Sequence, residues 1–337
     1  MKLNSTLGAL LNDPYEFYDW AQGAGVALVV LIATVNSGML EALGSTPARI
    51  EDLAAVVGVP TDKLSRLVSF LAAHGVITLR EDGLVERNGA TDNLELAAAP
   101  LKCIGIGSMS AGTSLLPALR KGITAYEQRH GTPVWEHLGA NPDLAKSFAG
   151  YMEFLTLRLE HFVFSEHRFQ PFDVAADIGG SHGGLLLSLL GHYPGTRGIL
   201  FDLPDVIEQV GDRVRTAPGG ERIELVGGSF FDAVPAADLA ILKQILHDWS
   251  DEKCAAILTN VRKSIAPGGR LAVIDFLLPE KPEPSQSLNF DIAMMLWASG
   301  RERTLSEFEA LFKASGFKLD HVAENPRGQS IVEAVPV

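Results

Sequence analysis

The first strong pattern along the chain is helical. Apolar residues recur at helical spacing over residues 14–43, which predicts a helix that ends before Gly44. Its longest apolar stretch, Val26–Ala33, has about eight residues against the roughly 20 that cross a bilayer, so we expect a buried helix and no membrane span. The residues before it lack the basic start and small-residue cleavage site of a secretory signal. These features predict a cytoplasmic protein.

A winged-helix pattern follows over residues 40–90. A short amphipathic helix stops at Gly58, and Thr61 is expected to cap a second helix. Two apolar stretches, 76–79 and 84–87, then flank a polar turn, which predicts a β-hairpin.

The winged helix raises the alternative of a DNA-binding regulator. Its second helix carries two basic residues, Lys63 and Arg66, beside Asp62, and the hairpin adds mainly acids. A recognition helix needs basic residues to contact phosphates. We therefore expect a dimerisation domain and no nucleic-acid partner.

The rest of the chain changes from helices to alternating strands and helices. Residues 95–165 are predicted to be mostly helical, with interruptions at Gly131–Pro133 and Asn141–Pro142. Apolar strands are predicted at 173–178, 198–201, 223–226, 238–242 and 270–275. With helices between them, these strands predict a doubly wound, mostly parallel α/β sheet, which binds ligands beyond the carboxyl ends of its strands.

Composition narrows the choice of partner. The 337 residues are 47% hydrophobic and 20% charged, as in an ordinary globular protein, and the length suits two domains. The net charge of −13 disfavours binding to nucleic acid or an anionic membrane, so a small-molecule partner is expected. Cys103 and Cys254 have no paired spacing, and no ligand cluster indicates a metal site.

A glycine-rich turn follows the first strand of the predicted sheet. It runs from Asp177 through Gly179 and Gly180 into a helix, and Asp202 ends the second strand, where a carboxylate can bind both ribose hydroxyls. The acid precedes the glycines and no G-x-G-x-x-G is present, so the pattern differs from a dinucleotide site. An acid in this place suits a ligand with a cationic amine, such as S-adenosylmethionine.

The chain resembles the caffeate-type and bacterial small-molecule O-methyltransferases, which use S-adenosylmethionine. The resemblance is carried, in family order, by Asp177-x-Gly-Gly-x-x-Gly, Phe201-Asp202-Leu203-Pro204, Gly227-Gly228-Ser229-Phe230-Phe231, Lys243-x-x-Leu246-His247-Asp248-Trp249-Ser250-Asp251, Pro267-Gly268-Gly269-Arg270 and Gly300-Arg301-Glu302-Arg303-Thr304. It implies a Rossmann-like class I methyltransferase domain over 166–337, a helical linker contributing to the acceptor pocket over 96–165, and a winged-helix dimerisation domain over 1–95. A homodimer is expected.

The resemblance also implies roles at the cofactor site. Gly179 and Gly180 would pass the methionine portion, with Asp177 close below it, and Asp202 would bind the ribose. Phe230 would cover the adenine, which Lys243 would contact from the other side. The predicted cofactor-binding set is Asp177, Gly179, Gly180, Ser181, Asp202, Leu203, Ser229, Phe230 and Lys243. S-adenosylhomocysteine would be the product.

The family implies that His247 is a general base flanked by Asp275 and Glu302. The chemistry supports this independently, because a phenol or carboxyl acceptor must lose its proton as it attacks the methyl sulfonium, and histidine titrates near neutral pH. A carboxylate at the second imidazole nitrogen fixes the tautomer.

Two positions depart from the family pattern. Ser181, followed by the bulky His182, replaces a third glycine, and Ser229 replaces an acid before the adenine-covering residue. A hydroxyl accepts a hydrogen bond less strongly than a carboxylate, so weaker cofactor binding is our hypothesis.

The acceptor pocket is expected between the linking helices and the last third of the chain. The residues predicted to line it are Tyr151, Met152, Arg158, His161, Met294 and Trp297, of which Arg158 and His161 would suit an acidic acceptor. Two enzyme alternatives stay open. One is transfer to sulfur or nitrogen, for example to an acidic thioether, with His247 positioning the acceptor; the other is a non-methylating enzyme that binds the same cofactor.

Overall fold

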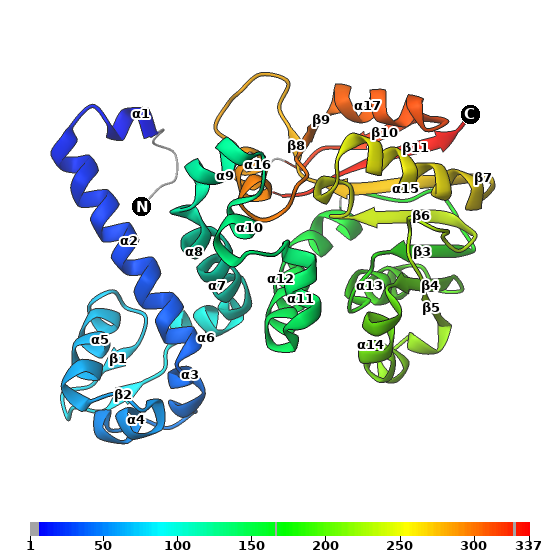
Figure 1. Ribbon diagram of the computed structural model, residues 1–337. Coiled ribbons are helices and arrows are strands. Elements are labelled where there is room, and N and C mark those ends of the chain that lie inside the picture. The colour runs from blue at the N-terminus through cyan, green and yellow to red at the C-terminus, as the bar shows by residue number, and fades with distance from the viewer. Residues whose placement is uncertain (1–6, 166, 326–327) are drawn as a thin grey trace. The chain divides into compact units, whose positions relative to one another are not determined.

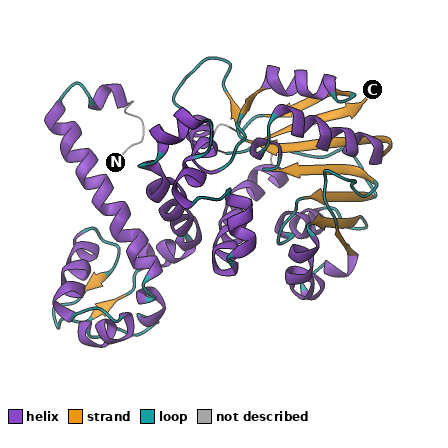
Figure 2. Cartoon of the chain, in the orientation of Figure 1, coloured by secondary structure: helices purple, strands orange, loops and turns teal. Residues whose placement is uncertain are grey.

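The structure, a computed structural model, describes residues 7–165, 167–325 and 328–337, without the side chains of residues 161, 164 and 165. The chain divides into two compact units, Met1–Ser110 and Ala111–Val337. Each unit has its own apolar core. Figure 2 shows that the first unit is almost entirely helical and that the second combines helices with a large sheet.

The first unit contains the predicted winged helix. Helices α4 (Ile50–Val57) and α5 (Thr61–Ala73) are followed by the antiparallel pair β1 (Thr78–Leu79) and β2 (Val85–Glu86), and buried Leu53, Leu64 and Val68 hold them together. Thr61 is the first residue of α5, and Pro60 occupies the cap position. The hairpin pairs also with Ala48 through Val85.

The helix predicted over 14–43 is interrupted. Helix α2 covers Pro14–Asn36, and Gly38, with a left-handed φ of 75°, separates it from α3 (Met39–Ala42). The expectation that this helix is buried is wrong, because within it the buried residues are Thr34 and Val35. Among the described residues, α2 is also the helix long and apolar enough to cross a membrane, with a mean hydropathy of 1.4 over its most apolar window.

Helices α6 to α12 occupy most of residues 89–165, which confirms the mostly helical segment predicted over 95–165 and begins it six residues earlier. Their bounds are α6 Gly89–Leu96, α7 Ala98–Ile104, a π-helical turn Gly105–Met109, α8 Ser110–Gly112, α9 Leu115–Lys121, α10 Ala125–His130, α11 Val134–Ala140 and α12 Pro142–Ser165. The breaks at Gly131–Pro133 and Asn141 fall where turn residues predicted them.

A seven-stranded sheet forms the centre of the second unit (Figure 1). Its order is β10-β11-β7-β6-β3-β4-β5, with β3 to β7 parallel and β11 antiparallel to its neighbours. The strands are β3 Val174–Ile178, β4 Arg197–Asp202, β5 Ile223–Gly227, β6 Ala237–Lys243, β7 Ile265–Asp275, β10 Phe317–Ala323 and β11 Ser330–Pro336. This confirms the predicted doubly wound fold.

Helices cover both faces of this sheet and enclose two apolar clusters. The covering helices are α13 Gly184–His192, α14 Pro204–Thr216, α15 Asp251–Ser264 and α17 Leu305–Ala314. Helix α16 Gln286–Trp297 instead contacts α10 and β8 Leu277–Leu278, which forms a short parallel pair with β9 Arg303–Thr304. The predicted start of β7 at 270 was late by five residues, because Ile265 already pairs with Ala237 before an irregularity in the register.

The strand order creates a switch point between β3 and β6. From β3 the chain moves outward through β4 and β5, and it then returns to β6 and β7 on the other side. Ligands of doubly wound sheets bind in the crevice beyond the carboxyl ends of the strands at such a point. Asp177 near the end of β3 and Lys243 at the end of β6 therefore mark where a site is expected.

Candidate active site

The turn after β3 brings backbone close to side chains from neighbouring strands. A Cβ atom added to Gly179 would lie 2.4 Å from Ile245 Cδ1, and one added to Gly180 would lie 2.7 Å from the Asp177 carboxyl carbon. A side chain at either position would have to displace these neighbours, and Gly179 also has a left-handed φ of 75° that favours glycine. A Cβ atom added to Gly179 would also lie 3.8 Å from Phe230 Cε1, so the residue predicted to cover the adenine lies beside the turn.

Asp202 at the end of β4 fixes this turn to the next strand. Its Oδ2 accepts from the Ser181 N–H at 2.8 Å, and its Oδ1 accepts from the Leu203 N–H at 2.7 Å. Ser181 has a left-handed φ of 48°, a conformation that glycine adopts without the cost that a side chain incurs. The serine therefore strains the loop at the place where a glycine was expected.

Phe230 lies in an aromatic group after β5. Its ring is 6.1 Å from that of Trp249, and Asn260 Nδ2 donates to the Phe230 carbonyl at 3.0 Å. Ser229, predicted beside the adenine, accepts from the Phe231 N–H at 3.2 Å, so its hydroxyl helps to shape this loop.

Two buried groups of opposite charge lie at the switch point. Burial raises the pKa of Asp177 to about 7, although the charge of Lys243 opposes that rise. Burial lowers the pKa of Lys243 to about 8 against the charges of Asp177 and Asp275. Lys243 Nζ also donates to Gln244 Oε1 at 3.0 Å, which in turn accepts from Gln329 Nε2 at 3.1 Å. Lys243 thus interacts electrostatically with acids of both the cofactor set and the catalytic set.

His247 and Glu302 form a buried pair. His247 Nδ1 donates to Glu302 Oε1 at 2.8 Å, and the two residues are 4% and 1% exposed. While Glu302 is ionised it can only accept, so Nδ1 then carries the proton and Nε2 has a free lone pair. Asp248 Oδ1 lies 3.7 Å from Nε2. This geometry suits a histidine that takes a proton at Nε2.

Asp275 completes the acidic surroundings of His247. It is 1% exposed at the end of β7, and neither carboxylate oxygen has a hydrogen-bond partner among the described residues. Burial raises its pKa to about 7, the charge of His247 opposes the rise, and that of Glu302 adds to it. Burial likewise raises the pKa of Glu302 well above its usual range.

The segment Gly300–Thr304 holds the loop that carries His247. The Arg303 guanidinium is buried and donates to the carbonyls of Leu246 and Trp249 at 2.8 and 2.9 Å. A Cβ atom on Gly300 would lie 2.0 Å from the His247 carbonyl oxygen. Sequence reasoning assigned a role to Glu302 in this segment and missed Arg303 and Gly300, although all three belong to the quoted motif.

Among the residues predicted to contact the acceptor, the structure places Trp297 in an aromatic group. Its ring stacks on that of Tyr126 at 5.6 Å, and the Tyr126 hydroxyl and His137 Nδ1 are joined by a hydrogen bond of 2.7 Å. Tyr126 is fully buried and was not predicted. The spacing of Tyr126 and His130, four residues apart on one helix, was the available signal.

The other predicted acceptor contacts differ in exposure. Tyr151, Met152 and Met294 are half-buried, whereas Arg158 is exposed, with its guanidinium 3.5 Å from Gln286 Oε1. The side chain of His161 lies outside the described part of the chain. An inward-facing Arg158 is therefore not what the structure shows.

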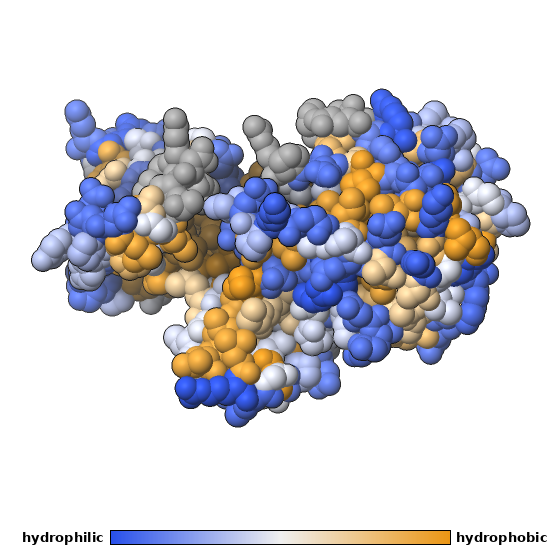
Figure 3. All heavy atoms as spheres, turned by 90° about the horizontal axis from the view of Figure 1, so that it is seen from above, coloured by the Kyte–Doolittle hydropathy of each residue, from blue (hydrophilic) through white to orange (hydrophobic). Residues whose placement is uncertain are grey.

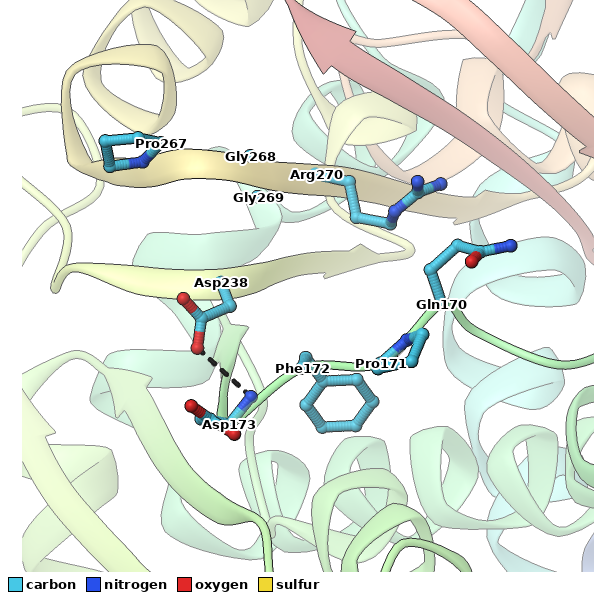
Figure 4. A pocket seen from close by; sticks show the side chains of 9 residues that line it. All are labelled: Gln170, Pro171, Phe172, Asp173, Asp238, Pro267, Gly268, Gly269 and Arg270. Atoms are coloured by element: carbon cyan, nitrogen blue, oxygen red, sulfur yellow. Dashed lines mark hydrogen bonds between the residues drawn. The ribbon is translucent and has the colours of Figure 1, made fainter.

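A separate pocket of about 280 Å3 lies at the opposite edge of the sheet, where β3 and β6 begin. Figure 4 shows Asp238 directed at the backbone of Asp173, whose N–H donates to Asp238 Oδ2 at 3.1 Å. Arg270 also lines this pocket but is paired with Asp320 and Glu333. The pocket is remote from the carboxyl ends of the strands, so it is not the candidate active site.

Fold and site together define a class of enzyme: a doubly wound sheet with a glycine turn after its first strand, an acid at the end of its second that accepts from that turn, and a buried histidine–carboxylate pair. The chain belongs to the O-methyltransferase family, whose domain model matches residues 113–318. It is 34% identical over 316 residues to a phenazine O-methyltransferase of Lysobacter antibioticus, a match covering 91% of this chain and 92% of that protein.

Two further comparisons agree. The chain is 32% identical to a 3-amino-4-hydroxybenzoate 4-O-methyltransferase of Streptomyces cremeus, over 86% of this chain and 82% of that protein. The solved structure of LaPhzM superposes on this chain with a TM-score of 0.90 at 32% identity, over 99% of this chain and 100% of that one.

These findings establish the activity. The protein is an S-adenosylmethionine-dependent methyltransferase that methylates oxygen on a small-molecule metabolite, as predicted. The comparisons give no support to transfer to sulfur or nitrogen, or to a non-methylating enzyme.

The raised pKa of Asp275 gives a pH-dependent prediction. Between about pH 4 and 7 folded Asp275 keeps a proton that the unfolded chain has lost, so its contribution to stability falls as the pH rises through this range. Asp275→Asn removes this penalty. We expect the variant to melt above the wild type at pH 8, by on the order of 2–4 °C or more, and to show little difference at pH 4.

Scanning calorimetry at both pH values checks this prediction. The exposed Asp173→Asn variant is the control and should follow the wild type throughout. A lower melting temperature for Asp275→Asn at pH 8 would show that the carboxylate stabilises the fold.

Proposed function

We propose that the acceptor is a hydroxyl group on an aromatic ring and that His247 removes its proton. The observation that carries this proposal is the buried 2.8 Å hydrogen bond from His247 Nδ1 to Glu302, which leaves Nε2 as the base. The relatives named above act on a phenazine and a hydroxybenzoate, both aromatic. The stacked rings of Trp297 and Tyr126 are consistent with an acceptor that has planar faces.

The residues at the switch point fit the cofactor. Gly179 and Gly180 carry no side chain, so their backbone is available for close approach of a ligand, and the buried Asp177 carboxylate beside Gly180 suits a cationic amine. Asp202 is proposed to accept from the ribose hydroxyls, Leu203 and Ser181 to frame that contact, and Phe230 to cover the adenine. An adenine contact for Lys243 stays a proposal. When bound, S-adenosylmethionine supplies an electrophilic methyl group.

The proposed catalytic residues then transfer one proton from the acceptor to His247. The acceptor O–H donates to His247 Nε2, and the proton moves to Nε2 as the oxygen becomes nucleophilic. The imidazolium that forms is stabilised at Nδ1 by Glu302, and Asp275 adds a second buried carboxylate nearby. Rate enhancement would come mainly from holding the acceptor oxygen in line with the methyl group.

The proposal is tested by isotopic methyl transfer. S-adenosylmethionine labelled in the methyl group is incubated with the protein and an extract of host metabolites, and labelled products are identified by mass spectrometry. We expect label on an aromatic hydroxyl. Label on an aliphatic hydroxyl or a carboxyl oxygen would overturn the proposed acceptor class while leaving the family assignment intact.

We also propose that the first unit forms a homodimer. Helix α2 exposes Tyr15, Tyr18, Val26 and Val29, which are 46–81% exposed and share one face at 100° per residue. Apolar groups show at the molecular surface as orange patches among hydrophilic residues in Figure 3. A two-fold interface would place this face of α2 against a second copy. Residues 96–165 are proposed to supply the acceptor pocket to the domain that follows.

Charging this face is expected to separate the protomers. The double variant Val26→Glu and Val29→Glu should shift the protein from dimer to monomer in analytical ultracentrifugation, because each charge would be desolvated at the interface. Ala24→Glu, on the opposite face of α2, is the matched control and should remain dimeric. A wild-type protein that sediments as a monomer would contradict the proposal.

The free, buried thiols of Cys103 and Cys254 are consistent with a reducing compartment. We therefore propose a cytoplasmic location.

A further inference from the structure

A chain of three polar side chains connects helix α12 to the glycine turn. Arg213 on α14 donates through Nη1 to His182 Nδ1 at 3.0 Å and to Glu153 Oε2 at 3.3 Å, and its Nη2 donates to Glu153 Oε1. Glu153 lies on α12, and His182 follows Ser181 in the glycine turn. One guanidinium therefore joins a helix of the linking region to the turn beside the cofactor site.

The contact with Arg213 fixes the state of the His182 ring. A guanidinium has donors and no acceptor, so Nδ1 must accept and the remaining ring proton must be on Nε2. The pKa of His182 is lowered, first by burial and then by the charge of Arg213, which favours the neutral ring that this bond needs. His182 is thereby held as a donor through Nε2.

His182 also lies close to Asp202. The charges of the two side chains interact, while the two oxygens of Asp202 accept from the backbone of Ser181 and Leu203. A ribose hydroxyl bound by Asp202 would donate to the carboxylate and would keep its own oxygen lone pairs as acceptors. A neutral histidine with its proton on Nε2 is suited to supply the missing donor.

We propose that His182 is a further cofactor-binding residue, oriented by Arg213 so that Nε2–H donates to a ribose oxygen, and that Glu153 links this contact to helix α12. This inference rests on the proposed cofactor site. Tyr151 and Glu153 are two residues apart on α12 and so face opposite sides of the helix. Tyr151 faces away from Arg213, and α12 therefore connects the proposed acceptor wall to the cofactor loop.

Calorimetric titration with S-adenosylhomocysteine tests the first part. Arg213→Gln should raise the dissociation constant by about two- to fivefold, the effect expected from losing an exposed ion pair that orients one hydrogen bond. Glu153→Gln should raise it by less, because Arg213 keeps its contact with His182. Arg215→Gln is the matched control on the same helix, since Arg215 pairs with exposed Asp212, and its affinity should equal that of the wild type.

Nitrogen-15 spectra of the histidine rings provide a readout independent of activity. In the wild type we expect one ring, absent from His182→Asn, with its proton on Nε2 and with Nδ1 unprotonated; in Arg213→Gln the same ring should populate both tautomers. A proton on Nδ1 in the wild type would overturn the proposal.

Failure of the cofactor site and failure of the His182 contact give different results. Wild-type protein that bound no S-adenosylhomocysteine would contradict the proposed cofactor site itself. Normal wild-type binding with unchanged affinity in both Arg213→Gln and His182→Asn would overturn the role of His182 alone. Melting temperatures of the variants should match that of the wild type, because Arg213 and Glu153 are 46% and 38% exposed and contribute little to folding.

Discussion

His247→Asn is expected to lower kcat by about two to four orders of magnitude while the dissociation constant for S-adenosylhomocysteine stays unchanged. The asparagine amide can still accept a hydrogen bond from the acceptor hydroxyl. It is too weak a base to take up the proton. Because His247 is hydrogen-bonded to Glu302 and lies in a loop that Arg303 holds, we expect its loss to affect the acceptor proton and not the glycine turn proposed to bind the cofactor.

Single-turnover methyl transfer measured by mass spectrometry checks this result. The exposed His192→Asn variant is the control and should be fully active. Raising the pH should partly restore His247→Asn when the acceptor is a phenol, because bulk solvent then removes the proton. Full activity in His247→Asn at neutral pH would exclude a proton-transfer role for the histidine.

Gly300→Ala should lower kcat by about a hundredfold, since a displacement of about 1 Å in a catalytic group is enough for such a loss. The added methyl group would overlap backbone, at 2.0 Å from the His247 carbonyl and 2.4 Å from the Asp248 carbonyl carbon. Backbone cannot rotate away as a side chain would, so the loop itself must shift. The same overlap should lower the free energy of unfolding by about 1–3 kcal/mol.

Kinetics and denaturant unfolding of Gly300→Ala, compared with Gly191→Ala, separate the two effects. Gly191 lies near the end of α13, is exposed and has no atom within 4 Å of an added Cβ, so alanine there should leave activity unchanged. Wild-type activity in Gly300→Ala would show that the loop adapts without moving His247.

The sheet and the acids at its strand ends could be predicted from the sequence, because buried parallel strands are apolar runs with polar residues where they stop. Asp177, Asp202 and Asp275 were all placed in this way. The exposure of most of α2 could not be predicted from its apolar residues, since apolar composition does not show whether another part of the protein covers a helix.

Contacts between segments far apart in the sequence could not be predicted. Arg303 contacts the carbonyl of Leu246, 57 positions earlier, and Arg213 contacts His182, 31 positions earlier. The periodicity of apolar residues in a single sequence indicates local structure and does not show which distant residues are in contact. Membership of a family motif pointed to His247 and Glu302 but not to the roles of Gly300 and Arg303 in the same motifs, and Tyr126 and Arg213 belong to no quoted motif.

The proposed catalytic residues and the proposed acceptor contacts lie on different kinds of element, which affects how such an enzyme can change its substrate during evolution. The residues proposed to move the proton and to bind the cofactor lie at the ends of β3, β4, β6 and β7, in the loops that follow β3 to β6, and just before β9, whereas Tyr151, Met152 and Trp297 lie on helices α12 and α16. Side chains on a helix can be exchanged without altering the strand register. Selection for a new acceptor could therefore proceed on these helices while the methyl-transfer chemistry is inherited intact.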